Sequence, residues 1–304
     1  MKKISIVLLA AGMAMFAQAQ KVSMRYNLKG GSTFYANQTS VQNIHQDIMG
    51  NAMDIKVTLN LRTAYSVLKV ENGLSTIDVT YESLGMNMES PMMNMAFDSA
   101  GEIDASNPMH SALSTIVGKK FTMVMDSRGK VASVSGFDKV MEELVAKFNG
   151  NQEMANQIAA SLEQQFSDDA MKSNMEMMTA IFPENAVAIG DTWVVKNTIR
   201  SGMELNSENT LTLKDVANGK WMVSGVAQLA TNSETAIQTQ GMESHFSLTG
   251  TAKYEMVLDA TTGWLIECNI NQSIDGKVSL EGGQLPSSME IPMKIESQTK
   301  TTSI

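Results

Sequence analysis

Apolar and polar residues alternate along most of the chain, and this period of two predicts β-strands. Between residues 55 and 62 every second side chain is apolar, as in a half-buried strand. Residues 246–258 keep the alternation for longer than the usual strand of about 5–6 residues. In 289–296 the alternation continues with Pro292 on the outward register, which favours an edge strand because proline donates no backbone hydrogen bond. Most of the chain is therefore expected to be an antiparallel β-structure.

A helical period replaces the alternation convincingly only in residues 137–182, where we expect three short helices. The first carries one apolar stripe with i, i+3, i+4 spacing and ends at Asn149–Gly150. The second is expected to begin at Asn151 and the third after Ser167, whose hydroxyl can cap the helix. Residues 85–109 fit neither period, and we expect a long loop or a frayed hairpin there.

Turn signals recur in the same order on both sides of the helical segment, which favours an internal duplication. An alternative is that unrelated β-hairpins reuse the same Asn-Gly and Asp-x-x-Gly turns. The corresponding landmarks are 31–34 with 190–193, 72–73 with 218–219, 120–126 with 253–259, and Gly129 with Gly263.

These patterns predict a mainly β (α+β) fold. It consists of two related, curved antiparallel β halves, shaped like a half-barrel, with a three-helix insert over the concave side. The expected divisions are a signal peptide at 1–19, an N-terminal β half at 20–136, a helical insert at 137–182, and a C-terminal β half at 183–304.

The first residues have the plan of a secretory signal peptide. Lys2 and Lys3 precede the apolar run 4–16, and Ala17-Gln18-Ala19 is a small-x-small cleavage site. No cysteine lies at the cleavage region, which argues against a lipid anchor, and no later segment predicts a transmembrane helix. We therefore expect an exported protein, periplasmic or secreted.

Charge and cysteine content narrow the function classes. Loss of Lys2 and Lys3 with the leader changes the formal net charge from −9 to −11, because residues 1–20 hold no acids. An acidic chain without a Lys/Arg cluster argues against nucleic acid as a partner. The single cysteine, Cys268, allows no intramolecular disulfide, and its place in a strand alternation predicts a buried, unreactive thiol.

Methionine is unusually frequent, with 26 residues, and its flexible side chain suits an adaptable apolar binding surface. Our leading hypothesis is that helices and sheet shelter a lipid or other apolar small molecule. A packed core is the simpler explanation of the same residues. The candidate lining residues are Met141, Leu144, Phe148, Met171, Met175, Met178, Tyr254 and Met256.

The densest methionine cluster also suggests a Cu(I) site, because thioethers are soft ligands. Its members are Met86, Met88, Met92, Met93 and Met95, and His45 and His110 could add nitrogen ligands. A structural role for the same methionines is the alternative that we favour.

No catalytic motif is present in the sequence. It contains no His-Glu-x-x-His, no Gly-x-Ser-x-Gly, no phosphate loop and no dinucleotide fingerprint, and the three histidines are scattered. We therefore expect a non-enzymatic protein without a cofactor. A structural or adhesive module that binds another envelope protein is the alternative to a ligand-binding protein.

Several of these features together resemble secreted bacterial proteins of an uncharacterised domain-of-unknown-function family. They are the Lys-Lys leader ending in Ala-Gln-Ala-Gln, the Tyr26-x-Leu28-Lys29-x-Gly31 opening, and Phe182-Pro183 leading to Gly190-Asp191-Thr192-Trp193. The expected architecture is also similar to half-barrels of the lipoprotein-carrier type, which implies a lipid-sized cavity. Neither resemblance assigns a role to any residue.

Overall fold

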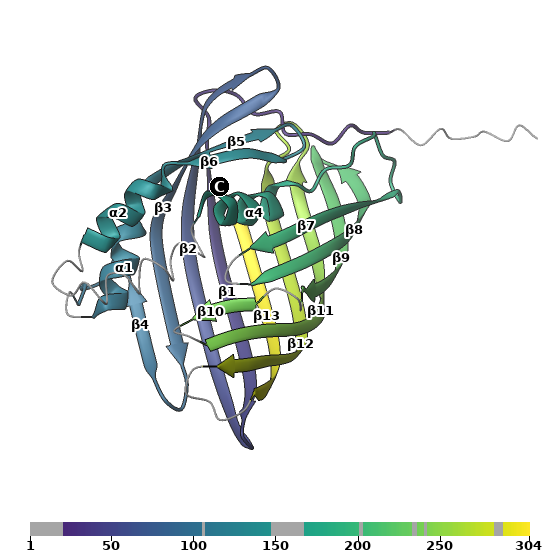
Figure 1. Ribbon diagram of the computed structural model, residues 1–304. Helices are drawn as coiled ribbons and strands as arrows, with labels where there is room; N and C mark the ends of the chain where they lie inside the picture. The colour runs from purple at the N-terminus through teal and green to yellow at the C-terminus, as the bar shows by residue number, and fades with distance from the viewer. Residues whose placement is uncertain are drawn as a thin grey trace, which may run out of the picture.

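The computed structural model describes residues 21–104, 107–146, 167–200, 203–232, 236–239, 242–282 and 288–304. The predicted signal peptide and the predicted second helix lie outside these residues. The prediction of a mainly β, half-barrel-like fold is confirmed. The described residues form one open, curved antiparallel sheet of thirteen strands, accompanied by three helices (Figure 1).

The N-terminal strands are β1 (Thr33–Ile48), β2 (Asn51–Glu71), β3 (Leu74–Glu89), β4 (Asn94–Asp98), β5 (Lys120–Asp126) and β6 (Val131–Ser135). The C-terminal strands are β7 (Thr192–Arg200), β8 (Glu204–Ala217), β9 (Lys220–Thr231), β10 (Ala236–Thr239), β11 (Met242–Asp259), β12 (Leu265–Gly282) and β13 (Met289–Ser303). The helices are α1 (Pro108–Ile116), α2 (Phe137–Ala146) and α4 (Asp168–Thr179).

The strand order is β6-β5-β3-β2-β1-β13-β12-β11-β9-β8-β7, with β4 added to β3 and β10 to β11. Most strands that follow one another in the chain are neighbours in the sheet, and β1 pairs with β13 from Ala36–Ser303 to Gln46–Met293. The sheet is one continuous meander whose free edges are β6 and β7. The two predicted halves are joined along the β1–β13 ladder rather than being separate sheets.

Corresponding turns occupy corresponding places in the two halves. Asn72-Gly73 connects β2 to β3 with φ of 52° and 77°, and Asn218-Gly219 connects β8 to β9 with φ of 53° and 70°. Both pairs lie in the left-handed region that a type I′ hairpin requires. The duplication stays a prediction, and the equivalent turns agree with it.

Helix α4 joins the two free edges of the sheet. Ser167 caps it by accepting a hydrogen bond from the Ala170 N–H at 3.3 Å, as predicted. Thr179 donates from Oγ1 to the Gly129 carbonyl in the β5–β6 turn at 2.6 Å. In the middle of the helix, Ser173 Oγ accepts a hydrogen bond from the Arg200 N–H of β7 at 3.2 Å. A helix between β6 and β7 protects both edges from pairing with other chains.

The segment 85–109 differs from the expected loop. β3 continues to Glu89 and forms a hairpin with β4, so the hairpin interpretation is confirmed. Helix α1 was not predicted from this region. It is a short helix of nine residues that begins at a proline. Asn107, just before it, accepts a hydrogen bond from the His110 N–H at 3.4 Å. These are helix start signals that the sequence analysis overlooked.

The prediction of an edge strand at Pro292 was wrong, because β13 lies between β1 and β12. The proline is accommodated because the β1–β13 ladder stops at Met293, one residue away. Pro292 keeps only its partner in β12, Lys277. Locally, the strand has one free side, which is the environment that proline needs.

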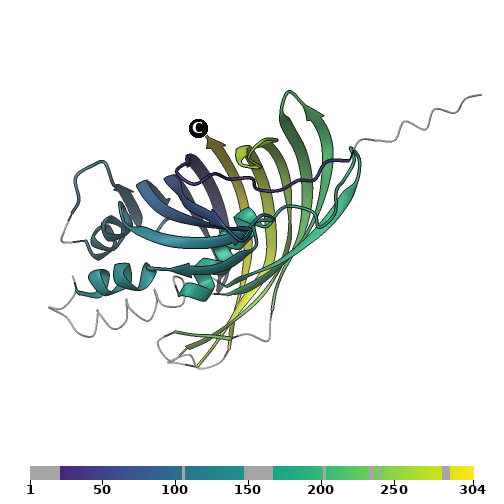
Figure 2. The ribbon, with the colours of Figure 1, turned by 90° about the horizontal axis from the view of Figure 1, so that it is seen from above.

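One end of the sheet is closed by a large core. The β2–β3, β5–β6, β8–β9 and β11–β12 turns lie here, and the N-terminal segment 21–29 crosses it (Figures 1 and 2). The Tyr26 N–H donates to the Ser127 carbonyl at 2.7 Å, and the Asn27 N–H donates to the Thr262 carbonyl at 2.9 Å. The side chains of Met24 and Tyr26 are buried in the core beneath the segment. We call this region the packed end and the opposite one the distal end.

Two glycines bend β11 and β12 near the distal end. A Cβ at Gly250 would lie 2.3 Å from the Ser273 carbonyl oxygen, and one at Gly276 would lie 2.0 Å from the Ser247 carbonyl oxygen. Only glycine permits so close an approach of two backbones. Beyond these positions, β10, β11 and β12 run across the view, whereas β1 and β13 run down it (Figure 1).

Candidate functional site

The concave face between the packed end and the distal end carries apolar side chains that stay partly exposed. Side chains alternate between faces along a strand, so positions 55, 57, 59 and 61 of β2 share the face of Tyr65 and Val67, which lie in the core. We call this set of partly exposed concave-face residues the apolar wall. It comprises Ile55, Val57, Leu59, Leu61, Leu84, Met86, Met88 and Met95.

The register of the strands makes the apolar wall continuous. Val57 lies opposite Met88, and Met88 lies opposite Met95 on β4. Directly opposed side chains on neighbouring strands are in contact range, so β2, β3 and β4 present one surface. At about 3.3 Å per residue, Ile55 to Leu61 alone spans about 20 Å along the strand. An apolar surface of this length matches an extended hydrocarbon chain.

A second apolar cluster lies across the concave face, on β9, β11 and β12. Its buried members are Ala227, Leu229, Leu248, Ala252 and Ile274. Partly buried residues of β13, among them Met293 and Ile295, pack against it. The concave face thus has apolar residues on both sides of the central β1–β13 ladder.

The residues expected to line a ligand site lie elsewhere. Met171, Met175 and Met256 are buried in the main core, Met141 and Tyr254 pack against it partly buried, and Met178 is 44% exposed. Phe148 lies outside the described residues, as does the side chain of Leu144. Met171 and Met175 therefore fill the core beneath α4, whereas Met178 does not.

The methionine cluster proposed as a copper site is divided by the β3–β4 hairpin. Met86, Met88 and Met95 belong to the apolar wall, whereas Met92 and Met93 lie at the turn, 84% and 55% exposed. The sequence signal for the wall was present in the alternation of Met86 with Met88. The sequence analysis weighed Cu(I) binding against a structural role for these methionines and did not predict β4 as the partner strand.

The two histidines considered with this cluster have other neighbours. His45 Nδ1 lies 2.5 Å from an Asp54 carboxylate oxygen, and His110 Nε2 lies 2.9 Å from the Ala96 carbonyl oxygen. The His110 ring also packs edge-on against Phe97, with the centroids 5.4 Å apart. Over the described ranges, no group of three or more His, Cys, Asp or Glu residues is placed to hold a metal ion.

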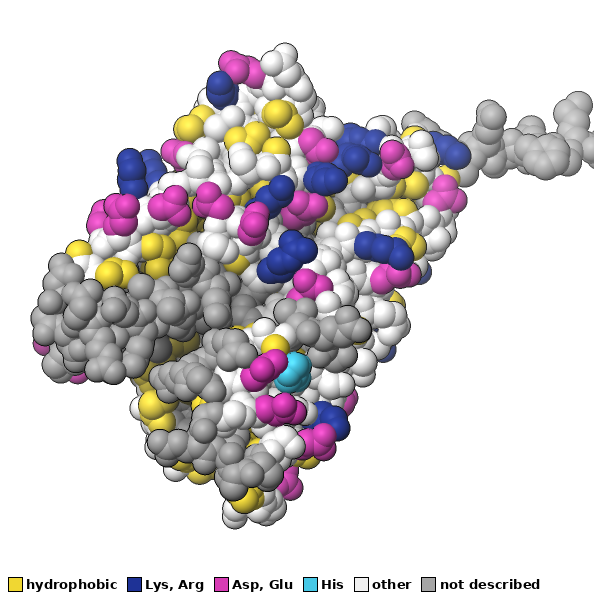
Figure 3. Space-filling view, in the orientation of Figure 1, with side chains coloured by type: hydrophobic (Ala, Val, Ile, Leu, Met, Phe, Trp, Pro, Cys, Tyr) yellow, Lys and Arg dark blue, Asp and Glu magenta, His cyan; other side chains and the backbone are white. Residues whose placement is uncertain are grey.

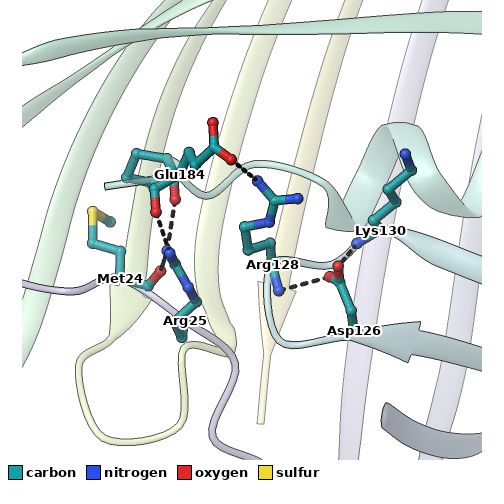
Figure 4. Close-up of polar contacts among 7 residues, drawn as sticks. Met24, Arg25, Asp126, Arg128, Lys130 and Glu184 are labelled. Carbon is teal, nitrogen blue, oxygen red and sulfur yellow. Dashed lines mark hydrogen bonds and ion pairs between the residues drawn. The ribbon is translucent and has the colours of Figure 1, made fainter. Parts of the chain in front are cut away.

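The packed end also has a groove, of about 450 Å³, between the α4–β7 connection and the β5–β6 turn. Figure 4 shows the contacts beside it. Arg25 donates from its guanidinium group to the backbone carbonyls of Met24, Pro183 and Glu184 at 2.5–2.6 Å. Asp126 accepts hydrogen bonds from the backbone N–H groups of Arg128 and Lys130. These contacts fix the N-terminal segment and the turn, so we assign them a structural role.

The face seen in Figure 3 mixes both signs of charge over the packed end and carries no large patch of one sign.

The titratable side chains with large pKa shifts lie in apolar surroundings. Burial raises the pKa of the Cys268 thiol to about 12 and that of Tyr254 to about 12. A thiol with so high a pKa carries almost no thiolate at neutral pH. Cys268 is therefore buried, as predicted, and poorly suited to be a nucleophile.

Comparisons with known proteins do not assign a function. No curated protein matches the sequence. Among solved structures, lipovitellin, described for its lipid–protein interactions, is similar at 8% identity with a TM-score of 0.48. The match covers 91% of this chain but only 25% of lipovitellin. Among the described residues, no helix is long and apolar enough to cross a membrane.

Two further similar structures come from bacteria. The translocator domain of the autotransporter NalP from Neisseria meningitidis is 7% identical, with a TM-score of 0.23, and the match covers 91% of this chain and 90% of that domain. The COG4313 outer membrane channel from Pseudomonas putida F1 is 6% identical, with a TM-score of 0.22, and the match covers 92% and 97%. With TM-scores this low, we base nothing on these likenesses.

The comparison with protein families identifies one family. A family model matches residues 72–265, from the β2–β3 turn to the first residue of β12, and so includes most of the sheet and all three described helices. The chain belongs to DUF6263, a family of unknown function, in agreement with the resemblance noted from the sequence.

Proposed function

We propose that this protein is a non-enzymatic binding protein that holds an apolar ligand, a lipid or another long-chain molecule, on its concave face. The observation that carries the proposal is the apolar wall, eight aliphatic and methionine side chains on three neighbouring strands that stay partly exposed. A monomeric protein rarely leaves so large a contiguous apolar surface without a use. Concave apolar surfaces are where small apolar ligands bind.

The composition of the apolar wall supports an adaptable rather than a rigid site. Three of its eight members are methionines, whose unbranched side chains change rotamer easily. Aromatic residues, which would fix a ligand's shape, are absent from the wall. Such a surface suits ligands that differ in chain length or unsaturation.

The test is a fluorescence titration of the mature protein with N-phenyl-1-naphthylamine, an uncharged apolar probe. We expect saturable binding that weakens in the double variant Leu59→Gln/Met88→Gln. Losing two half-buried apolar contacts should reduce affinity about tenfold. The matched control is Thr58→Gln/Asn87→Gln, on the outward registers of the same strands. Absence of saturable binding, or equal affinity in both variants, would contradict the proposal.

We also propose that the protein acts after export, in the periplasm or outside the cell. The support is the charged, then apolar, then small-x-small pattern of residues 1–19. Cell fractionation and N-terminal sequencing of the tagged full chain test this. The expected product begins at Gln20 in the exported fraction, and an intact Met1 in the cytoplasmic fraction would sink the idea.

A further inference from the structure

The centre of the concave face is polar, although both of its sides are apolar. Three consecutive cross-strand pairs join β1 and β13 on this face, Gln38 with Thr301, Ser40 with Thr299, and Gln42 with Ser297. We call these six residues the polar stripe. Gln272 of β12 extends it, since it lies opposite Ser297 on the same face. The polar stripe follows the two central strands of the sheet, which lie side by side in Figure 1.

The registers place the polar stripe directly against apolar neighbours. Ser40 lies opposite Leu59 of the apolar wall on one side. On the other side, Thr299 lies opposite Ile270, which packs against the second apolar cluster. A ligand that covers the apolar wall would therefore meet the polar stripe as soon as it reached across the sheet.

Packing within the protein uses only part of the hydrogen-bonding capacity of the polar stripe. Ser40 and Thr299 hydroxyls lie 2.9 Å apart and bond to each other. Within the described part of the chain, the side chains of Gln38, Gln42, Ser297 and Thr301 make no such bond, although Ser297 and Thr301 are only 8% and 7% exposed. Neither hydroxyl is among the buried, partnerless side-chain atoms of the described residues, so a ligand can still reach both of them.

The concave face also lacks ionic groups. In the described residues, the registers that share this face on β1, β2, β3, β4, β12 and β13 carry no Asp, Glu, Lys, Arg or His. The charged side chains of these strands, such as Lys56, Arg62 and Lys300, lie on the outward registers. A carboxylate or phosphate held at the polar stripe would lose its hydration without gaining a cation.

We propose that the ligand of the concave face carries uncharged hydrogen-bonding groups, an alcohol, ester or amide, beside its apolar chain, and that the polar stripe binds these groups. The inference rests on the proposed function and names the ligand class for the same site. Carboxamide and hydroxyl side chains both donate and accept hydrogen bonds, so they match such groups without charge. The apolar wall then binds the hydrocarbon chain of the ligand, and the polar stripe binds its uncharged polar group.

The test compares two ligands with the same chain, monooleoylglycerol and oleate, added together in equal amounts to the mature protein. Retained ligand is quantified by mass spectrometry after separation from free ligand, at about pH 9, where the carboxyl group is ionised. We expect a preference of about tenfold or more for the neutral glyceride, which corresponds to one or two net hydrogen bonds.

Two variants assign the preference to the polar stripe. Ser40→Ala/Thr299→Val removes the bonded hydroxyl pair with little change in volume, and Gln42→Leu removes a carboxamide. Both should keep binding the oleoyl chain while the preference falls to about threefold or less. The control Gln298→Leu lies on the outward register of β13 and should behave as the parent protein. Circular dichroism and the melting temperature confirm that each variant is folded.

The outcomes separate the two proposals. Equal retention of both ligands, preference for oleate, or an unchanged preference in the stripe variants would overturn the assignment of a neutral head group and leave apolar binding intact. Retention of neither ligand by the parent protein would overturn apolar binding itself.

Discussion

The packed end and the apolar wall use the same strands and differ in the chemistry of their side chains. On β2, Tyr65 is buried at the packed end, whereas Leu59, farther along the same face, is partly exposed. Trp264 has three aromatic neighbours, with ring centroids 4.5 Å from Phe34, 5.1 Å from Tyr65 and 6.1 Å from Tyr26. The apolar wall has only aliphatic and methionine side chains.

The difference shows how one sheet can stabilise the fold at the packed end and leave the apolar wall available for binding. Aromatic side chains bury large areas in preferred geometries and so specify a rigid core. Flexible aliphatic side chains specify less, and their surface remains available. We therefore expect substitutions at the packed end to change the free energy of unfolding, and substitutions on the apolar wall to change ligand affinity.

The largest effect is expected for Trp264→Ala. Removing an aromatic side chain from a closed core should lower the free energy of unfolding by about 3–5 kcal/mol. Urea unfolding followed by circular dichroism measures the loss. Trp264→Phe is the control. It keeps a ring and removes an indole N–H that is buried without a partner within the described structure, so it should cost much less. Comparable losses in both variants would mean that the ring contacts do not stabilise this end.

A smaller effect is expected when the N-terminal segment is released. Arg25→Ala removes three hydrogen bonds from the guanidinium group to backbone carbonyls that are partly exposed. We expect a loss of about 1–2 kcal/mol, because bonds to charged donors are strong but solvent competes for them here. Faster hydrogen exchange at Tyr26 and Asn27 would locate the change. Lys21→Ala, an exposed position on the same segment, should leave both readouts unchanged.

The smallest effect is expected on the pH dependence of stability. Burial acts to raise the pKa of Asp259, but hydrogen bonds from Thr262 and Thr261 outweigh it and hold the pKa below its usual value. A lowered folded-state pKa stabilises the protein above the unfolded pKa, and this contribution is lost as the pH falls through the folded value. Below about pH 4, Asp259→Asn should therefore lose less stability than the parent protein.

The concave face should respond differently to pH. Its described registers on β1–β4, β12 and β13 hold no Asp, Glu, Lys, Arg or His, and burial raises the pKa values of Tyr65, Tyr81 and Cys268 on this face far above neutral. The affinity for an uncharged probe should therefore stay constant between about pH 5 and 8. Titrations with N-phenyl-1-naphthylamine at several pH values, on protein that stays folded, measure it. A steep pH dependence would place an ionisable group at the site.

The local signals in the sequence predicted much of the packed end. Alternation identified β2, β11 and β13, Ser167 predicted the cap of α4, and Asn72-Gly73 predicted a hairpin, because each depends on neighbouring residues alone. The β1–β13 pairing depends on contacts between the two ends of the chain. No local pattern encodes such a pairing, so the central ladder was not predicted.

The sequence predicted the apolar character of the candidate site but not which residues form it. Gln38, Ser40 and Gln42 point to the concave face, whereas Val41 between them lies on the outward register. This inverts the usual apolar-inward alternation, so the sequence alone would assign the polar residues to solvent. The registers of β1 with β2 and β13 were needed to place them.

The pairing of β1 with β13 also sets the order in which the molecule can be completed. The central ladder joins Ala36 to Ser303, so the middle of the sheet forms only when the last strand is available. Contacts this distant in sequence slow folding, because a long loop must close before they are gained. Until β13 arrives, β1 and β12 are open edges on either side of a missing strand. The centre of the sheet therefore cannot form before this fifteen-residue strand has been synthesised.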